Sequence, residues 1–161
     1  MKEIKVDEED NEIGYLDYSS KKNSGDLYES IIHGKGGINT PSHLYRTDVY
    51  GKIGYYDPDL RFEDTDFWLR LTKVFNVGYI NTNHTYYRWH GENLSDSNNI
   101  LKFYNEEIVK IFKKNIGDEE LKKTAILKMY RKSYLRALRT FQIGYFFKYL
   151  FKYLKLKYLD K

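Results

Sequence analysis

The stretch Arg61-Phe-Glu-Asp-Thr-Asp-Phe-Trp-Leu-Arg-Leu71 combines a cluster of acids with apolar residues in helical spacing. From Asp64, steps of three, four, seven and eleven residues reach Phe67, Trp68, Leu71 and Phe75. This is the spacing of one face of an α-helix. We therefore predict a helix over residues 64–75 in which the Asp64 side chain points toward the protein interior.

The two aspartates of this stretch have different expected roles. Asp66 lies off the apolar face and four residues before Arg70, so the two can pair across an exposed turn for a few tenths of a kcal/mol. Asp64 allows two interpretations. An aspartate at a helix N-terminus commonly caps free N–H groups and meets the positive end of the dipole. An inward-facing carboxylate can also serve a functional site, and both interpretations stay open here.

The rest of the chain predicts short mixed elements followed by helices. Upstream we expect a β-hairpin from residues 4–6 and 13–16, a helix over 27–33 capped by Asp26, an extended segment over 38–45, and a helical turn over 47–50 closed by Gly51. Downstream we expect short strands over 77–80 and 85–90, then helices over 100–112, 119–141 and 145–159. These elements predict an α/β fold of α+β appearance, with one domain over residues 1–97 and a helical basic and aromatic region over residues 98–161.

Composition limits the classes of function. With 161 residues the chain is long enough for one domain with a core. It has no cysteine, which excludes thiolate nucleophiles and thiolate metal sites and fits a reducing compartment. The charged N-terminus lacks the apolar core of a signal peptide, and no stretch approaches the length of a spanning helix. We therefore expect a cytoplasmic location.

Charge is distributed unevenly along the chain. Residues 121–161 contain twelve Lys and Arg against Asp160, a net charge of +11, which leaves −7 on residues 1–120 because the total is +4. In the last predicted helix Lys148, Lys152 and Lys155 share one stripe. The remaining face is apolar and comprises Phe146, Phe147, Leu150, Phe151, Leu154 and Tyr158.

The pattern of this last helix allows two main interpretations. Its pattern is typical of a helix in a membrane interface with its lysines among acidic headgroups, which would place the protein on the inner face of the plasma membrane. An amphipathic helix packed on the domain explains the pattern equally well. Nucleic acid is not expected as a partner, because no recognised binding motif accompanies the charge.

Four segments occur in an order that resembles a known family. They are Ser42 to Arg46, the loop Ile53-Gly-Tyr-Tyr-Asp-Pro-Asp-Leu60, Glu63-Asp64 followed by Phe67 to Arg70, and Tyr87-Arg-Trp-His90 with Asn93 and Ser95. Together they are similar to the C-terminal, acceptor-side half of family 2 glycosyltransferases, which have the GT-A fold. The resemblance covers roughly residues 26 to 95.

The resemblance implies a role for several residues. In enzymes of this family the aspartate of the Glu-Asp pair takes the proton from the acceptor hydroxyl, and that role falls on Asp64. The later arginine and histidine help to hold the donor diphosphate and its divalent metal, Mn²⁺ or Mg²⁺, which implicates Arg88 and makes His90 a candidate metal ligand. Further candidates for substrate contact are Ser42, Glu63 and Trp68.

The chain departs from the family pattern in its N-terminal part. The nucleotide-binding half and its metal-ligating Asp-x-Asp motif are not found upstream. Asp57-Pro-Asp59 lies in a turn, and Asp64-Thr-Asp66 has its carboxylates on different helical faces. The resemblance therefore implies an incomplete GT-A Rossmann-like fold that binds a nucleotide-sugar donor weakly or not at all, with a glycan or lipid-linked acceptor. The alternative is a non-catalytic module that docks on a membrane surface or a partner.

Overall fold

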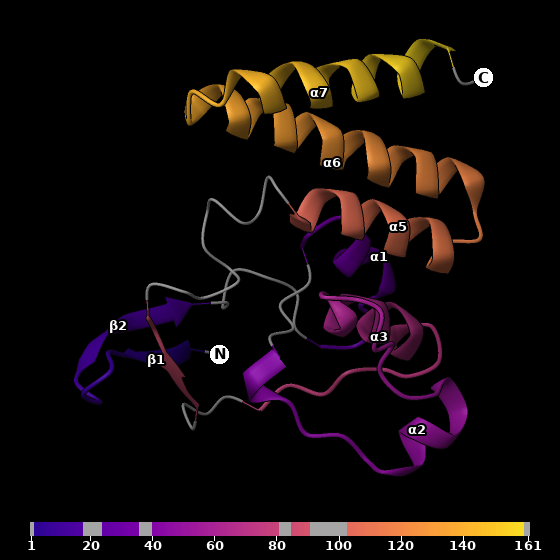
Figure 1. Ribbon diagram of the computed structural model, residues 1–161. Coiled ribbons are helices and arrows are strands. Elements are labelled where there is room, and N and C mark those ends of the chain that lie inside the picture. The colour runs from indigo at the N-terminus through magenta and orange to yellow at the C-terminus, as the bar shows by residue number, and fades with distance from the viewer. Residues whose placement is uncertain (1, 18–23, 36–39, 81–84, 91–102, 160–161) are drawn as a thin grey trace. The chain divides into compact units, whose positions relative to one another are not determined.

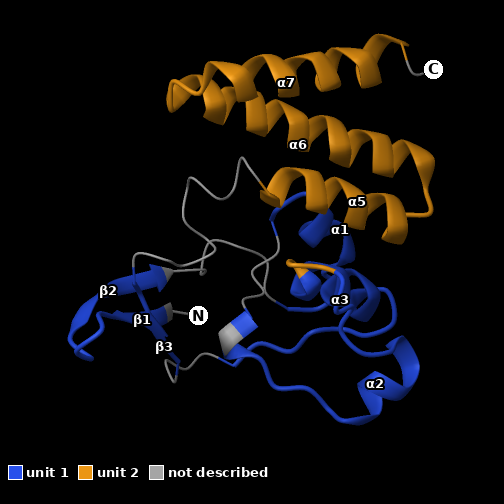
Figure 2. Cartoon of the chain, viewed as in Figure 1, with its two compact units in different colours: residues 1–59, 63–93 blue, residues 60–62, 94–161 orange. Residues whose placement is uncertain are grey.

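The computed structural model describes residues 2–17, 24–35, 40–80, 85–90 and 103–159, which form a mixed α+β structure (Figure 1). The chain divides into two compact units (Figure 2). The first unit contains residues 1–59 and 63–93, and the helical unit contains residues 60–62 and 94–161. The domain boundary expected between residues 97 and 98 lies outside the described residues.

The first unit contains a three-stranded sheet with β1 (Lys2–Val6) in the centre. β1 pairs antiparallel with β2 (Glu12–Asp17), which confirms the predicted hairpin. It pairs in parallel with β3 (Tyr86–Arg88), the described part of the strand predicted over residues 85–90. A parallel pair needs a long crossover connection, and here that connection carries the helices of the first unit.

Three helices of the first unit lie between β2 and β3 in the sequence: α1 (Tyr28–Ile32), α2 (Asp48–Ile53) and α3 (Glu63–Thr72). The Asp26 carboxylate accepts a hydrogen bond from the Tyr28 N–H, but the N-cap residue of α1 is Leu27 rather than the predicted Asp26. The prediction that Gly51 ends α2 is wrong. The helix continues to Ile53 and ends at Gly54, whose φ of 79° is a conformation that favours glycine.

Two predicted extended segments are not strands. Thr40–Ser42 is a short 3₁₀ helix, in which the fixed φ of Pro41 suits a helical turn. Residues 38 and 39, with which that predicted segment begins, lie outside the described residues. Of residues 77–80, Val77 makes only an isolated antiparallel bridge to Gly25. Short runs of alternating or apolar residues are ambiguous when no long periodic pattern supports them.

The core of the first unit is largely aromatic and is built around α3. Phe67, Trp68 and Leu71 are buried together with Val49 of α2. The Phe67 side chain is fully buried, and its ring stacks on Tyr56 at a centroid distance of 4.4 Å. Burying such a side chain contributes about 1.5–3 kcal/mol. The predicted inward face of α3 is therefore confirmed for its apolar residues.

The helical unit contains α5 (Asn105–Asn115), α6 (Glu119–Arg139) and α7 (Ile143–Leu154), followed by a π-helical turn over Lys155–Leu159. The Asp118 carboxylate accepts from the Leu121 N–H and caps α6, as expected for a helix start. The chain reverses at Phe141, whose φ is 55°, so the last helix begins before Gly144 rather than after it. Within the described residues no helix has the length and apolar character needed to cross a membrane.

Candidate functional site

The Asp64 carboxylate is held by hydrogen bonds to both of its oxygens. Oδ2 accepts from the Thr40 hydroxyl at 2.6 Å, and Oδ1 accepts from the Thr65 N–H at 2.6 Å and from the Thr65 hydroxyl at 3.3 Å. The side chain is partly buried rather than fully inward-facing. Oδ1 thus satisfies an N–H of the first turn of α3, while Oδ2 faces a different segment of the chain. The contact of Oδ1 supports the interpretation of Asp64 as a helix-start carboxylate, and its functional interpretation stays a prediction.

The Thr40–Ser42 turn connects α3 with the sheet. While Thr40 donates to Asp64, the Ser42 hydroxyl donates to Oε1 of Glu3 at 2.7 Å. Glu3 lies on β1 and is fully buried. Buried carboxylates need hydrogen-bond donors, and Ser42 supplies one. Ser42, a predicted substrate contact, therefore binds Glu3, and it lies two residues after Thr40, which binds Asp64.

His43 follows this turn and is partly buried. Its ring packs on Trp68 at a centroid distance of 3.8 Å, and Nδ1 donates to the Thr40 carbonyl at 3.1 Å. Burial lowers the pKa of the imidazole to about 4, which outweighs the opposing hydrogen bond to Thr40 and the charge of Asp64. Near pH 7 the ring is thus neutral.

Glu63 and Trp68, two other predicted substrate contacts, lie at the start and in the middle of α3. Glu63 is partly buried and opens the helix. Trp68 is 5% exposed and packs against the His43 ring, so its indole is a core side chain, and its contact with substrate stays a prediction. The same spacing that aligns Trp68 with Phe67 and Leu71 accounts for its burial.

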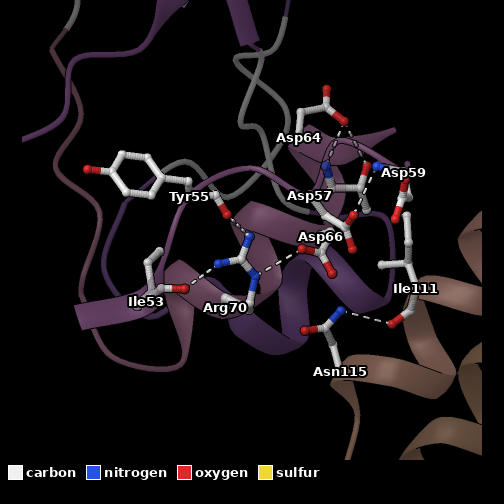
Figure 3. Close-up of polar contacts among 10 residues, drawn as sticks. Ile53, Tyr55, Asp57, Asp59, Asp64, Asp66, Arg70, Ile111 and Asn115 are labelled. Carbon is white, nitrogen blue, oxygen red and sulfur yellow. Dashed lines mark hydrogen bonds and ion pairs between the residues drawn. The ribbon is translucent and has the colours of Figure 1, made fainter. Parts of the chain in front are cut away.

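Asp66 has a different environment from the one its position in the sequence suggested. It is fully buried and pairs with Nε of Arg70 at 2.9 Å. Arg70 also donates to the carbonyls of Ile53 and Tyr55, and Figure 3 shows its guanidinium reaching all three partners. The predicted pair exists, but the prediction of an exposed pair is wrong, because Arg70 binds the backbone after α2 and encloses Asp66.

Arg88 contacts the turn between β1 and β2. Its guanidinium donates to the carbonyls of Asp7 at 3.0 Å and Glu8 at 3.1 Å, and forms an ion pair with Asp10 at 2.6 Å. The register places Arg88 opposite Val6, about 10 Å further along β1 than Glu3, where Ser42 binds. These contacts place the Arg88 guanidinium at the β1–β2 turn, and its role at the donor diphosphate stays a prediction from the resemblance.

The residues described in the structure do not fit a divalent metal. His90 is exposed and lies two residues beyond Arg88. Over the described ranges, no group of three or more His, Asp or Glu side chains is placed to hold a metal ion. His90 as a metal ligand stays a prediction from the resemblance.

The structure adds three residues to the site that the sequence did not single out. Glu3, Thr40 and His43 join Ser42 and Asp64 in one polar cluster, which we call the Asp64 cluster. Thr40 and Asp64 are 24 residues apart, and Glu3 and Ser42 are 39 apart. The only local signal was the clustering of hydroxyl and imidazole groups around Pro41. Comparisons with protein-family models, with curated proteins and with solved structures found no match for this chain.

Proposed function

We propose that the first unit is the acceptor-side part of an inverting, nucleotide-sugar-dependent glycosyltransferase of GT-A type, with Asp64 as the general base. The observation that carries this proposal is the Asp64 carboxylate, which is oriented by Thr40 and Thr65 at the start of α3 and is still partly exposed. The order of the sequence segments that resemble family 2 enzymes supports the same role.

The proposed reaction uses Asp64 to activate a sugar hydroxyl. The hydroxyl oxygen bonds to the anomeric carbon of the donor while the bond from that carbon to the diphosphate oxygen breaks. The electron pair leaves with the diphosphate, and the hydroxyl proton passes to Asp64. A hydroxyl is a poor nucleophile without such a base, and a positioned carboxylate contributes about 10²–10⁴ in rate.

The Asp64 cluster supports this chemistry through positioning. The Thr40 hydroxyl holds Oδ2 at 2.6 Å, which limits rotation of the carboxylate. The neutral imidazole of His43 donates to the Thr40 carbonyl and thereby restrains the same turn. Arg88 contacts the β1–β2 turn, so we assign the charge that receives the diphosphate to the donor-binding half.

The experiment compares two aspartates in the first turns of helices. The chain is assayed for sugar transfer to lipid-linked and free glycan acceptors, together with a nucleotide-sugar-binding half supplied in trans. We expect Asp64→Asn to lower turnover by about 100-fold or more. Asp48→Asn, at the first position of α2 and outside the Asp64 cluster, serves as the matched control and should retain turnover.

Two results would contradict the proposal. One is near-normal turnover of Asp64→Asn in a system where the wild type is active. The other concerns the affinity of the chain alone for a nucleotide-sugar donor. Isothermal titration with UDP-sugars and Mn²⁺ should show weak or no binding, and tight metal-dependent binding would mean that the chain holds a complete donor site.

A further inference from the structure

One face of α7 and of the turn that follows it exposes a row of large apolar side chains. The row, which we call the α7 stripe, consists of Ile143, Phe147, Phe151, Leu154 and Tyr158. Steps of four, four, three and four residues place them on one side of a helix. Their exposed fractions lie between 42% and 67%. Contiguous apolar surface of this kind usually marks an interaction site.

The opposite face of α7 is already occupied within the helical unit. Tyr149 is fully buried and lies 6.3 Å from Tyr130 of α6 between ring centroids. The ring centroid of Tyr134 in α6 lies 6.2 Å from that of Phe146 and 5.7 Å from that of Tyr153. The expectation that this helix packs on the protein is therefore correct for this face. The α7 stripe stays exposed, because the apolar side chains of α7 cover more of its circumference than α6 contacts.

The lysines of α7 have two different roles. Lys148 and Lys152 form ion pairs with Glu106 of α5 at 3.1 Å and 2.6 Å, so they hold α7 to α5. Both lysines therefore have an acidic partner within the helical unit. Lys155 and Lys157 lie in the turn after α7, are exposed, and flank the α7 stripe on its two sides. Nζ of Lys157 lies 4.9 Å from the ring centroid of Tyr158, at the edge of the stripe.

We propose that the α7 stripe binds the interface of an anionic lipid bilayer. The apolar side chains enter the boundary between headgroups and acyl chains, and Lys155 and Lys157 extend to the lipid phosphates. The net charge of +11 over residues 121–161 is complementary to an anionic surface. A helix parallel to the surface needs no spanning length, so the short α7 is sufficient.

Charge also discriminates against other occupants of this surface. Residues 143–159 contain no Asp or Glu, so a second copy that met the stripe with its own stripe would offer Lys155 and Lys157 no anionic partner. A nucleic acid would match the charge but would leave the aliphatic side chains of Ile143 and Leu154 exposed. A lipid surface accounts for both the apolar and the basic character.

The first test is co-sedimentation of the full chain with vesicles. Vesicles of equal parts phosphatidylcholine and phosphatidylglycerol should bind the chain, and added salt or pure phosphatidylcholine should weaken the binding. Phe147→Ser combined with Phe151→Ser should lower the partition coefficient by at least about tenfold. Tyr55→Ser combined with Ile80→Ser removes two exposed apolar side chains of the first unit and should leave the partition coefficient unchanged.

A second measurement does not depend on the stability of the double variant. Phe147→Trp places a fluorophore in the α7 stripe, and its emission should shift to the blue and be quenched by brominated lipids when anionic vesicles are added. Three results would overturn the proposal. They are undiminished vesicle binding by a folded double variant, no lipid quenching of the Phe147→Trp signal, and sedimentation velocity showing a dimer that depends on Phe147.

Discussion

The Asp66 carboxylate has no exposed surface, and Arg70 provides a charged partner for it within the same helix. A buried carboxylate is stable only when charge and hydrogen bonds compensate for lost hydration. Arg70 also binds the carbonyls of Ile53 and Tyr55, so a single guanidinium joins α3 to the loop that precedes it. Loss of this side chain affects both the ion pair and the loop.

We predict that Arg70→Met destabilises the protein by roughly 2–4 kcal/mol, because Asp66 stays buried without its guanidinium. Urea denaturation followed by Trp fluorescence measures this free energy of unfolding. Arg46→Met is the matched control, since Arg46 pairs with Asp48 on the surface and such pairs contribute less than about 1 kcal/mol. Equal losses for the two variants would contradict the buried-pair interpretation.

His43 makes the stability of the protein depend on pH. Burial lowers the pKa of its imidazole from 6.5 to about 4, against the smaller effects of the Thr40 hydrogen bond and the Asp64 charge. Between these two values the unfolded chain binds a proton that the folded protein does not. Stability from this group is therefore fully present above about pH 6.5 and is lost as the pH falls through about 4.

We predict that the free energy of unfolding decreases from pH 7 to pH 5 and that His43→Phe reduces this decrease. Phenylalanine can still pack on Trp68 but binds no proton. Urea denaturation at the two pH values measures the difference, and His90→Phe, at an exposed position, should keep the wild-type dependence. The interpretation is wrong if His43→Phe loses as much stability between pH 7 and pH 5 as the wild type.

At the scale of secondary-structure elements, Glu106 of α5 is the main polar contact for α7. Burial would raise the pKa of its carboxyl, but the hydrogen bonds and charges of Lys152 and Lys148 outweigh this effect and lower the pKa. Stability from this contact is accordingly present above the ordinary carboxyl pKa and lost as the pH falls through the lowered value. The contact joins two side chains of α7 to α5.

We predict that Glu106→Gln increases hydrogen exchange of the α7 amides relative to those of α6, because both lysines lose their anionic partner. Hydrogen exchange monitored by mass spectrometry resolves the two helices. Glu119→Gln is the control, since Glu119 pairs with Lys122 within α6 and is exposed. If α7 exchange is unchanged in Glu106→Gln, aromatic packing rather than the ion pairs holds this helix.

At the scale of the whole molecule, the two proposals rest on different units. The Asp64 cluster belongs to the first unit, and the α7 stripe belongs to the helical unit. Residues 1–120 carry a net charge of −7 and residues 121–161 carry +11. A lipid-linked acceptor would join the two proposals, because membrane binding would raise its local concentration near the site. Either proposal can still fail while the other holds, since no residue is used in both.

Local patterns predicted much of the secondary structure. The β1–β2 hairpin and the apolar face of α3 follow from alternation and helical spacing within a few residues. Boundaries were less accurate at Gly51 and Gly144, because a glycine is tolerated inside a helix and only Gly54 has a left-handed φ among the three.

The sequence was sufficient to identify Asp64 as a carboxylate at a helix start and to locate the basic, aromatic C-terminal region, since both depend on neighbours within a few turns of chain. It was not sufficient to find that Thr40 and Glu3 join one cluster or that Arg88 binds the β1–β2 turn. Nor could it show that Glu106 forms ion pairs with two lysines of α7. These contacts join residues 24 to 81 positions apart, and such pairings depend on how the packed elements meet rather than on local periodicity.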